Sequence, residues 1–344
     1  MGYPKFLNHY FKVKNYELPA RFKITGRIPV EFDSDASIEE LWDIHDYEME
    51  TCRTIINDVY SYGSYSGIPK TDLSLLDLKV AIADRILENC HFCERRCGVN
   101  RKKGILGYCR IDEISRYSSE FLHRGEEPEL VPSHTIFLAG CVFSCVYCQN
   151  WDISTHPTNG IVINPGNVAE LIDIRRVQGA CNVNFVTPTP HTHNILKIIN
   201  EMSVNTPLIW NSNMYHSSEV GKLLEGVIDL YLADFRYGND KCAEVYSNVK
   251  DYLHVVQRNF ETAYQHAEII LRQLVLPGHI ECCTRPIVEW TATHIPKVRF
   301  NIMFQYTPYY RAGEYMEINR YLTLNERERA IQIVREAGLE DVLV

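Results

Sequence analysis

Three closely spaced cysteines carry the clearest chemistry in this sequence. Cys141, Cys145 and Cys148 have the spacing C-x3-C-x2-C and follow a short apolar run, residues 135–139, that predicts a buried strand. Gly140 allows the backbone to turn sharply after that strand, so the three thiols can converge on one loop. Thiolates are the usual ligands of iron-sulfur clusters, and a four-iron cluster held by only three of them leaves one iron free to bind a small molecule.

This spacing resembles the signature of the radical S-adenosylmethionine (SAM) enzymes, in which an aromatic residue precedes the third cysteine. Tyr147 occupies that position. The resemblance implies that Cys141, Cys145 and Cys148 hold a catalytic [4Fe-4S] cluster, and that its electron cleaves SAM to a 5′-deoxyadenosyl radical. The alternatives are a zinc knuckle or three unrelated buried cysteines, but structural zinc sites usually close with four ligands and this loop offers three.

A second cysteine group precedes the first and has the pattern C-x2-C-x3-C-x11-C. It consists of Cys90, Cys93, Cys97 and Cys109. Four thiolates can close the coordination of a second iron-sulfur cluster, a zinc ion or a mononuclear iron, and four neighbouring thiols can also form a redox-active cluster without metal. The basic residues around them favour an anionic metal site or a docking patch for a redox partner, with a solvated basic loop as the alternative.

The remaining cysteines and an acidic run receive structural interpretations. Five cysteines show no ligand spacing, so we expect them to pack as small buried hydrophobic side chains. They are Cys52, Cys181, Cys242, Cys282 and Cys283. Residues 124–129 are rich in glutamate and precede the three-cysteine loop, so we expect a solvated loop there.

The chain after the three-cysteine loop alternates between predicted strands and helices. Strands are expected at residues 183–186, 207–211, 228–234, 268–275 and 298–306, and helices at 167–178, 192–202, 217–225, 251–266, 283–293 and 325–337. Continuous apolar strands joined by helices predict a parallel sheet. With the cysteine strand, this predicts an α/β fold, a partial (β/α)6 barrel of the radical SAM type.

The region before the barrel is predicted as a helical and four-cysteine extension. Residues 1–35 are expected to be irregular, a capping box at Ser37 and Glu40 opens a helix, residues 60–70 form a loop and residues 71–88 form a second helix. The expected domains are an N-terminal helical extension at 1–88, a four-cysteine segment at 89–130 and the barrel at 131–344.

Polar residues follow the predicted strands, where parallel βα folds collect their chemistry. Thr187 and Asn211 end two of these strands and can hydrogen-bond SAM. Asp234 and Arg236 resemble the Asp-Leu-Lys motif of glycyl-radical activating enzymes, whose cation pairs with the SAM carboxylate. Leu276 lies in a Leu-Pro-Gly segment similar to the one that packs on adenine in that group.

Several motifs resemble an uncharacterised iron-sulfur branch of the pyruvate formate-lyase activating enzyme homologues. They are Arg-Arg-Cys-Gly-Val-Asn-Arg, Cys-Gln-Asn, Leu-Ala-Asp-Phe-Arg-Tyr and Leu-Val-Leu-Pro-Gly, and the resemblance covers about residues 88–344. It implies hydrogen abstraction from a protein or peptide, with a flavodoxin or ferredoxin as reductant. The alternatives are radical chemistry on a small metabolite and a two-site electron-transfer protein without SAM turnover.

Composition limits the remaining function classes. The chain has 344 residues, of which 45% are hydrophobic and 23% charged, as in soluble globular proteins. No apolar stretch reaches the roughly 18 residues of a membrane span, and no secretory signal begins the chain, so we expect a cytoplasmic protein without a membrane partner. The net charge of −9 argues against broad nucleic-acid binding.

Overall fold

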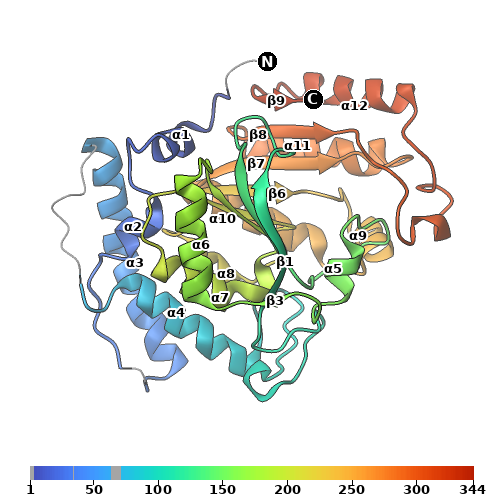
Figure 1. Ribbon diagram of the computed structural model, residues 1–344. Helices are drawn as coiled ribbons and strands as arrows, with labels where there is room; N and C mark the ends of the chain where they lie inside the picture. The colour runs from blue at the N-terminus through green and yellow to red at the C-terminus, as the bar shows by residue number, and fades with distance from the viewer. Residues whose placement is uncertain (1–3, 34, 63–70) are drawn as a thin grey trace.

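A mixed nine-stranded sheet organises the computed structural model, which describes residues 4–33, 35–62 and 71–344 (Figure 1). Its strands are β1 (Arg116–His123), β2 (Ser133–Leu138), β3 (Ile161–Val162), β4 (Val183–Val186), β5 (Leu208–Ser212), β6 (Leu230–Asp234), β7 (Glu268–Leu274), β8 (Arg299–Met303) and β9 (Val342–Leu343). The spatial order is β3-β1-β2-β4-β5-β6-β7-β8-β9. In this spatial order, the strands from β2 to β9 run parallel to one another. Strand β1 pairs antiparallel with β2 on one side and with β3 on the other. The α/β class is confirmed.

Helices join each pair of consecutive parallel strands. They are α5 (Trp151–Thr155), α6 (Pro165–Val177), α7 (Thr192–Glu201), α8 (Ser218–Leu224), α9 (Asp240–Ser247), α10 (Tyr252–His266), α11 (Arg285–His294) and α12 (Leu324–Glu336). Several begin at a local cap: Asn164 caps α6, Ser217 caps α8 and Asn239 caps α9. The predicted helices are present, and α5, α9, β1, β3 and β9 are additional elements that the sequence did not predict.

The N-terminal region packs against the sheet and its helices. The capping box of Ser37 and Glu40 opens α3 (Ile38–Tyr62) as predicted, and α4 (Leu75–Ile86) packs against α3 and α7. A loop was expected at residues 60–70. Residues 60–62 belong to α3, and residues 63–70 lie outside the described residues. In Figure 1, α3 and α4 lie on the opposite side of the molecule from α12.

Residues 1–35 were wrongly expected to be irregular, because α1 (Asn8–Lys14) and α2 (Arg21–Thr25) lie there. The Glu268 carboxylate accepts the backbone N–H groups of His9 and Tyr10 at 2.7 and 2.8 Å, which satisfies two unpaired donors at the start of α1. Tyr10 belongs to a small core with Leu130, Ile209, Leu230 and other strand residues. The cap of α1 therefore comes from β7, where no local pattern predicts it.

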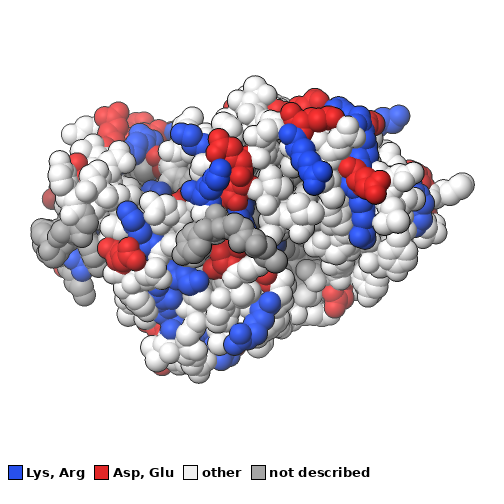
Figure 2. All heavy atoms as spheres, turned by 90° about the horizontal axis from the view of Figure 1, so that it is seen from above, with Lys and Arg blue, Asp and Glu red and all other residues white. Residues whose placement is uncertain are grey.

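No helix in the described ranges is both long and apolar enough to span a membrane. On the face shown in Figure 2, basic and acidic side chains are interspersed, and no continuous basic surface is visible.

Candidate functional site

The three-cysteine loop is positioned by a glycine turn and by α9. Gly140 has φ +91°, and a Cβ there would lie 2.6 Å from the Ile111 side chain, so glycine is required for both conformation and space. The backbone N–H groups of Ser144 and Val146 donate to the carbonyls of Ser247 and Tyr246 at 3.1 and 2.9 Å. The end of α9 therefore holds the loop at the end of β2.

A cavity of about 360 Å³ opens at the carboxyl ends of the parallel strands. Its lining includes eight of the nine predicted catalytic and SAM-binding residues: Cys141, Cys145, Cys148, Tyr147, Thr187, Asn211, Asp234 and Arg236. The ninth, Leu276, is buried and is not among the described residues that line this cavity. Leu274 and Met303 supply apolar wall instead.

The three thiols are surrounded by hydrogen-bond donors. Cys145 Sγ accepts from Ser247 Oγ at 2.9 Å and lies 3.7 Å from Arg236 Nη1, and Cys141 Sγ accepts from the Phe143 N–H at 3.3 Å. Burial, with a further contribution from neighbouring Cys145, raises the pKa of the Cys141 thiol to about 12. Bound iron would have to stabilise the thiolate, and donors directed at the sulfurs are among the groups that tune iron-sulfur potentials.

Both cysteine groups offer ligands for a metal centre. Thiolates bind iron-sulfur clusters and zinc alike. The three-cysteine loop offers three thiols and the segment before it offers four.

Arg236 presents an unsatisfied donor beside this loop. Its Nη2 donates to Asp234 Oδ2 at 2.5 Å, whereas its buried Nε has no hydrogen-bond partner among the described residues. The Thr189 hydroxyl, also in the cavity lining, is likewise buried without a partner in the described part of the chain. Buried polar groups are normally satisfied, so these two atoms mark places where a polar ligand would be bound. Thr187 has φ +62°, a strained conformation for a β-branched residue, at the end of β4.

An ion-pair cluster beside the cavity, formed by Arg272 with Glu126 and Glu127, was not predicted from the sequence. The expectation of a solvated loop at residues 124–129 is wrong for its carboxylates, since the side chains of Glu126 and Glu127 are only 7% and 2% exposed. Arg272 of β7 donates to both carboxylates at 2.5 Å, and Glu126 also accepts from Asn184 at 3.1 Å. His123, Glu126 and Arg272 line the cavity. A signal was present, because an arginine inside an apolar strand requires acidic partners.

The four cysteines of the second group lie close to one another. Burial raises the pKa of Cys93, and the thiols of Cys109, Cys90 and Cys97 raise it further. Cys90 is buried, Cys93 and Cys109 are half-buried and Cys97 is exposed. Arg101 is fully buried and donates to the carbonyls of neighbouring loops, so this basic residue is structural rather than solvated.

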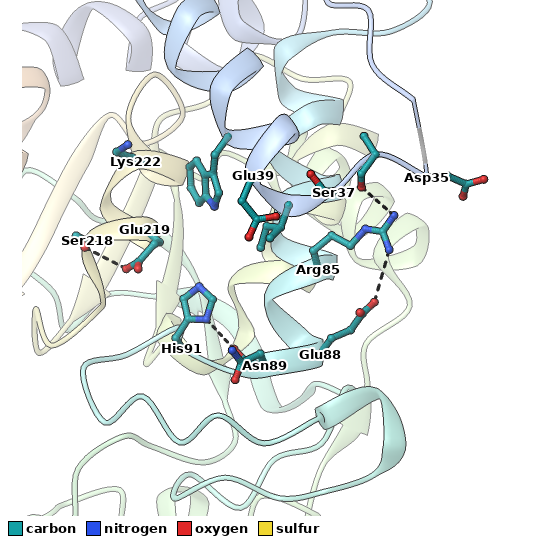
Figure 3. Close-up of a pocket in the computed structure, with 13 residues that line it drawn as sticks. Asp35, Ser37, Glu39, Arg85, Glu88, Asn89, His91, Ser218, Glu219 and Lys222 are labelled. Atoms are coloured by element: carbon teal, nitrogen blue, oxygen red, sulfur yellow. Dashed lines mark hydrogen bonds and ion pairs between the residues drawn. The ribbon is translucent and has the colours of Figure 1, made fainter.

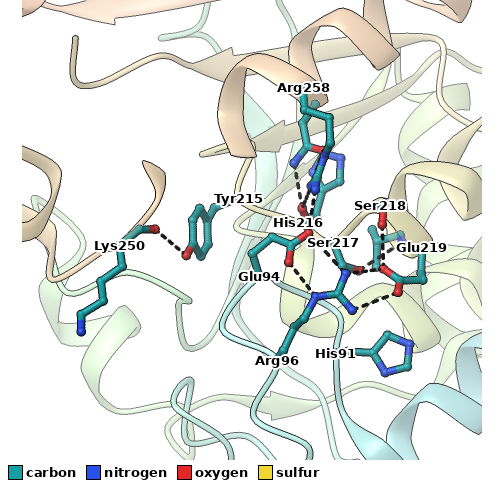
Figure 4. A network of polar contacts seen from close by, with 12 residues as sticks. His91, Glu94, Arg96, Tyr215, His216, Ser217, Ser218, Glu219, Lys250 and Arg258 are labelled. Atoms are coloured by element: carbon teal, nitrogen blue, oxygen red, sulfur yellow. Dashed lines mark hydrogen bonds and ion pairs between the residues drawn. The ribbon is translucent and has the colours of Figure 1, made fainter. Parts of the chain in front are cut away.

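Ion pairs attach the four-cysteine segment to helices that follow the parallel strands (Figure 4). Arg96 bridges Glu94 and Glu219 of α8 at 2.7 and 2.8 Å, and Arg258 of α10 pairs with Glu94 at 2.9 Å. An isolated bridge also joins Cys93 to the chain just before α8. These contacts anchor the first three cysteines of the segment to α8 and α10.

Two further contacts join the cysteine groups directly. Tyr108, next to Cys109, is hydrogen-bonded through its hydroxyl to Ser144 Oγ at 2.8 Å. Arg95 donates to the Val142 carbonyl at 2.6 Å. The two groups are therefore neighbours in space, as an electron path between two clusters would require.

A larger hollow of about 720 Å³ lies beside the second group, between the start of α3 and α8 (Figure 3). His91 lines it, and the His91 Nδ1 contacts the Asn89 carbonyl at 2.6 Å. Arg85 and Glu88 form an ion pair on its wall. No cysteine lines this hollow among the described residues, so the smaller cavity at the strand ends is the better candidate for chemistry.

No protein-family model matches the chain. Over 342 residues it is 44% identical to the uncharacterized protein MJ0674 of Methanocaldococcus jannaschii. The chain belongs to the family of that protein. The similarity covers 97% of this chain and 98% of MJ0674, so it includes the N-terminal region and both cysteine groups as well as the sheet.

Proposed function

We propose that this protein is a radical SAM enzyme with a partial barrel fold. Cys141, Cys145 and Cys148 would hold a [4Fe-4S] cluster, which supplies the electron that cleaves SAM to a 5′-deoxyadenosyl radical. The observation that carries the proposal is one cavity at the strand ends that contains these three thiols and the polar residues predicted for SAM. Its volume of about 360 Å³ falls within the range of about 300–1,000 Å³ typical of small-molecule sites.

The protein's own residues would bind and orient SAM. Arg236 has a buried Nε free to donate to the SAM carboxylate, while Asp234 fixes its guanidinium through Nη2. The unpaired Thr189 hydroxyl and the amides of Asn211 and Asn213 offer further hydrogen bonds. Tyr147 donates to Tyr237 at 2.7 Å and covers the cluster side of the cavity, where it would help to exclude water.

A protein or peptide is the substrate class that the cavity rim supports best. Exposed aromatic residues follow Thr307 of the lining: Tyr309 and Tyr310 are 51% and 42% exposed. Tyr310 stacks on Trp151 with ring centroids 5.2 Å apart. Aromatic side chains are enriched in surfaces that bind proteins. Radical chemistry on a small metabolite would leave this rim without a role.

The second group, Cys90, Cys93, Cys97 and Cys109, would hold another iron-sulfur cluster, since its four thiols lie close together and four thiolates can close the coordination of a four-iron cluster. Exposed Cys97 marks where a flavodoxin or ferredoxin would approach. The contacts of Tyr108 and Arg95 with the three-cysteine loop support a position for this cluster beside the catalytic one.

Anaerobic reconstitution with iron and sulfide tests the proposal, followed by measurement of 5′-deoxyadenosine from SAM with dithionite. We expect about eight irons per chain and SAM cleavage. The Cys145→Ala variant should lose cleavage, whereas Cys181→Ser, at a buried cysteine outside both groups, should retain it. Full turnover by Cys145→Ala would refute the assignment. Clusters without deoxyadenosine formation would favour the electron-transfer alternative.

A further inference from the structure

A third group of ligand-type side chains lies outside the cavity and both cysteine groups. Cys242 on α9, His279 after β7 and Cys282 in the short helix Ile280–Thr284 each offer a ligand atom, and all three atoms lie within 4.8 Å of one another. The sequence analysis wrongly treated Cys242 and Cys282 as buried hydrophobic residues, since Cys282 is exposed and Cys242 is half-buried. Their ligand spacing spans separate elements and is invisible in the sequence.

The histidine is oriented as a metal ligand requires. His279 Nδ1 lies 2.7 Å from the Pro277 carbonyl, and a carbonyl can only accept, so Nδ1 carries a proton and the lone pair of the neutral ring is on Nε2. Metal-binding histidines usually donate their other N–H to a carbonyl or carboxylate in this way. His279 is only 7% exposed, and its ring contacts Tyr246 edge-on at 5.1 Å. The imidazole is therefore held in place before any ion binds.

The backbone around the two cysteines is equally constrained. Asn239 accepts from the Cys242 N–H and donates to the Cys282 carbonyl, both at 2.8 Å, so one side chain connects the two ligand segments. A Cβ on Gly238 would lie 2.7 Å from the Cys283 Cα and 2.6 Å from the Cys283 carbonyl oxygen. This close approach joins the loop after β6, which carries Arg236, to the helix that carries Cys282.

The donor set indicates which cation the group would bind. Two sulfurs and one imidazole nitrogen favour Zn²⁺ over Mg²⁺ or Ca²⁺, which prefer oxygen ligands.

We propose that Cys242, His279 and Cys282 bind one Zn²⁺ with water as its fourth ligand, and that this ion joins α9 to the loops after β6 and β7. The ligand atoms need to move inward by less than about 1 Å to reach the spacing of about 3.8 Å between zinc-bound sulfurs. The same α9 supports the three-cysteine loop through Tyr246 and Ser247. The zinc would thus stabilise the wall of the cavity without taking part in its chemistry.

Zinc-dependent protection of Cys282 tests this proposal in the reconstituted full-length protein. Iodoacetamide modification of each cysteine is followed by peptide mass spectrometry, after EDTA treatment and after addition of one equivalent of ZnCl₂. We expect zinc to slow the modification of exposed Cys282 at least about tenfold, because a metal-bound thiolate is not free to react. The figure is set by metal sites in which the loss of one supporting contact weakens metal affinity about tenfold or more. Equal rates with and without zinc in the wild-type protein would overturn the proposal.

Variants assign the protection to these ligands. His279→Gln should abolish the zinc effect on Cys282, whereas Cys181→Ser should leave it unchanged; protection that persists in His279→Gln contradicts the proposed ligand set. Elemental analysis should find one zinc beside the iron, and Cys242→Ser should lose that zinc while keeping its iron. None of these measurements uses SAM, so their failure is distinguishable from failure of the radical SAM proposal.

Discussion

Replacement of Arg272 by methionine should destabilise the protein strongly at neutral pH and only weakly in acid. Its side chain is 15% exposed and pairs with two carboxylates, Glu126 and Glu127, that are nearly inaccessible to solvent. Removing one partner of a buried ion pair costs about 3–5 kcal/mol, because the remaining charge is left without compensation. We therefore expect the free energy of unfolding of Arg272→Met to fall by about 3–5 kcal/mol at pH 8.

The pH dependence follows from Glu127. Burial acts to raise its pKa from 4.5, but the ion pair with Arg272 outweighs burial, so the pKa in the folded wild type is lowered. This carboxylate stabilises the wild type above pH 4.5 and loses that contribution as the pH falls. Without Arg272, burial alone raises the pKa, so the variant loses stability as the pH rises. The difference between the two proteins should therefore shrink towards pH 4.5.

Urea unfolding followed by circular dichroism between pH 5 and pH 8 measures this difference. Arg311→Met is the matched control, since Arg311 forms an exposed ion pair with Glu314 and should leave the stability nearly unchanged at every pH. A penalty for Arg272→Met that is independent of pH, or that grows in acid, would refute the electrostatic argument. A penalty equal to that of the control would show that the ion pair contributes nothing.

Three further substitutions test the cavity and the fold. Arg236→Met should weaken SAM binding by about 10–150-fold in equilibrium dialysis, since a charged hydrogen bond contributes about 1.5–3 kcal/mol, and unchanged affinity would exclude Arg236 from carboxylate binding. Gly238→Ala should lower the free energy of urea unfolding by about 1–3 kcal/mol through overlap with the Cys283 backbone, whereas Gly313→Ala, with nothing closer than 4.0 Å, should be neutral; equal effects would contradict the close approach. Thr323→Ala removes the capping box of α12 and should cost about 1 kcal/mol in the same assay, and a neutral result would show that the cap is dispensable.

The sequence by itself determined the elements whose signals are local. The apolar strands, the capping box of Ser37 and Glu40 and the spacing of Cys141, Cys145 and Cys148 each lie within a few residues. Because parallel strands end on one edge, these local signals also predicted that Asn211 and Asp234 would gather beside the cysteines. The cavity brings them together as expected.

The tertiary structure alone decided which distant residues complete these local elements. Glu268 caps α1 although it is 258 residues from Tyr10, and Arg272 meets Glu126 across 146 residues, so no periodicity or motif could pair them. Cys242, His279 and Cys282 likewise meet only because α9 packs against the loop after β7. A helix or a loop motif is encoded by neighbouring residues, whereas the partner of a buried charge or thiol is selected by the packing of the whole chain.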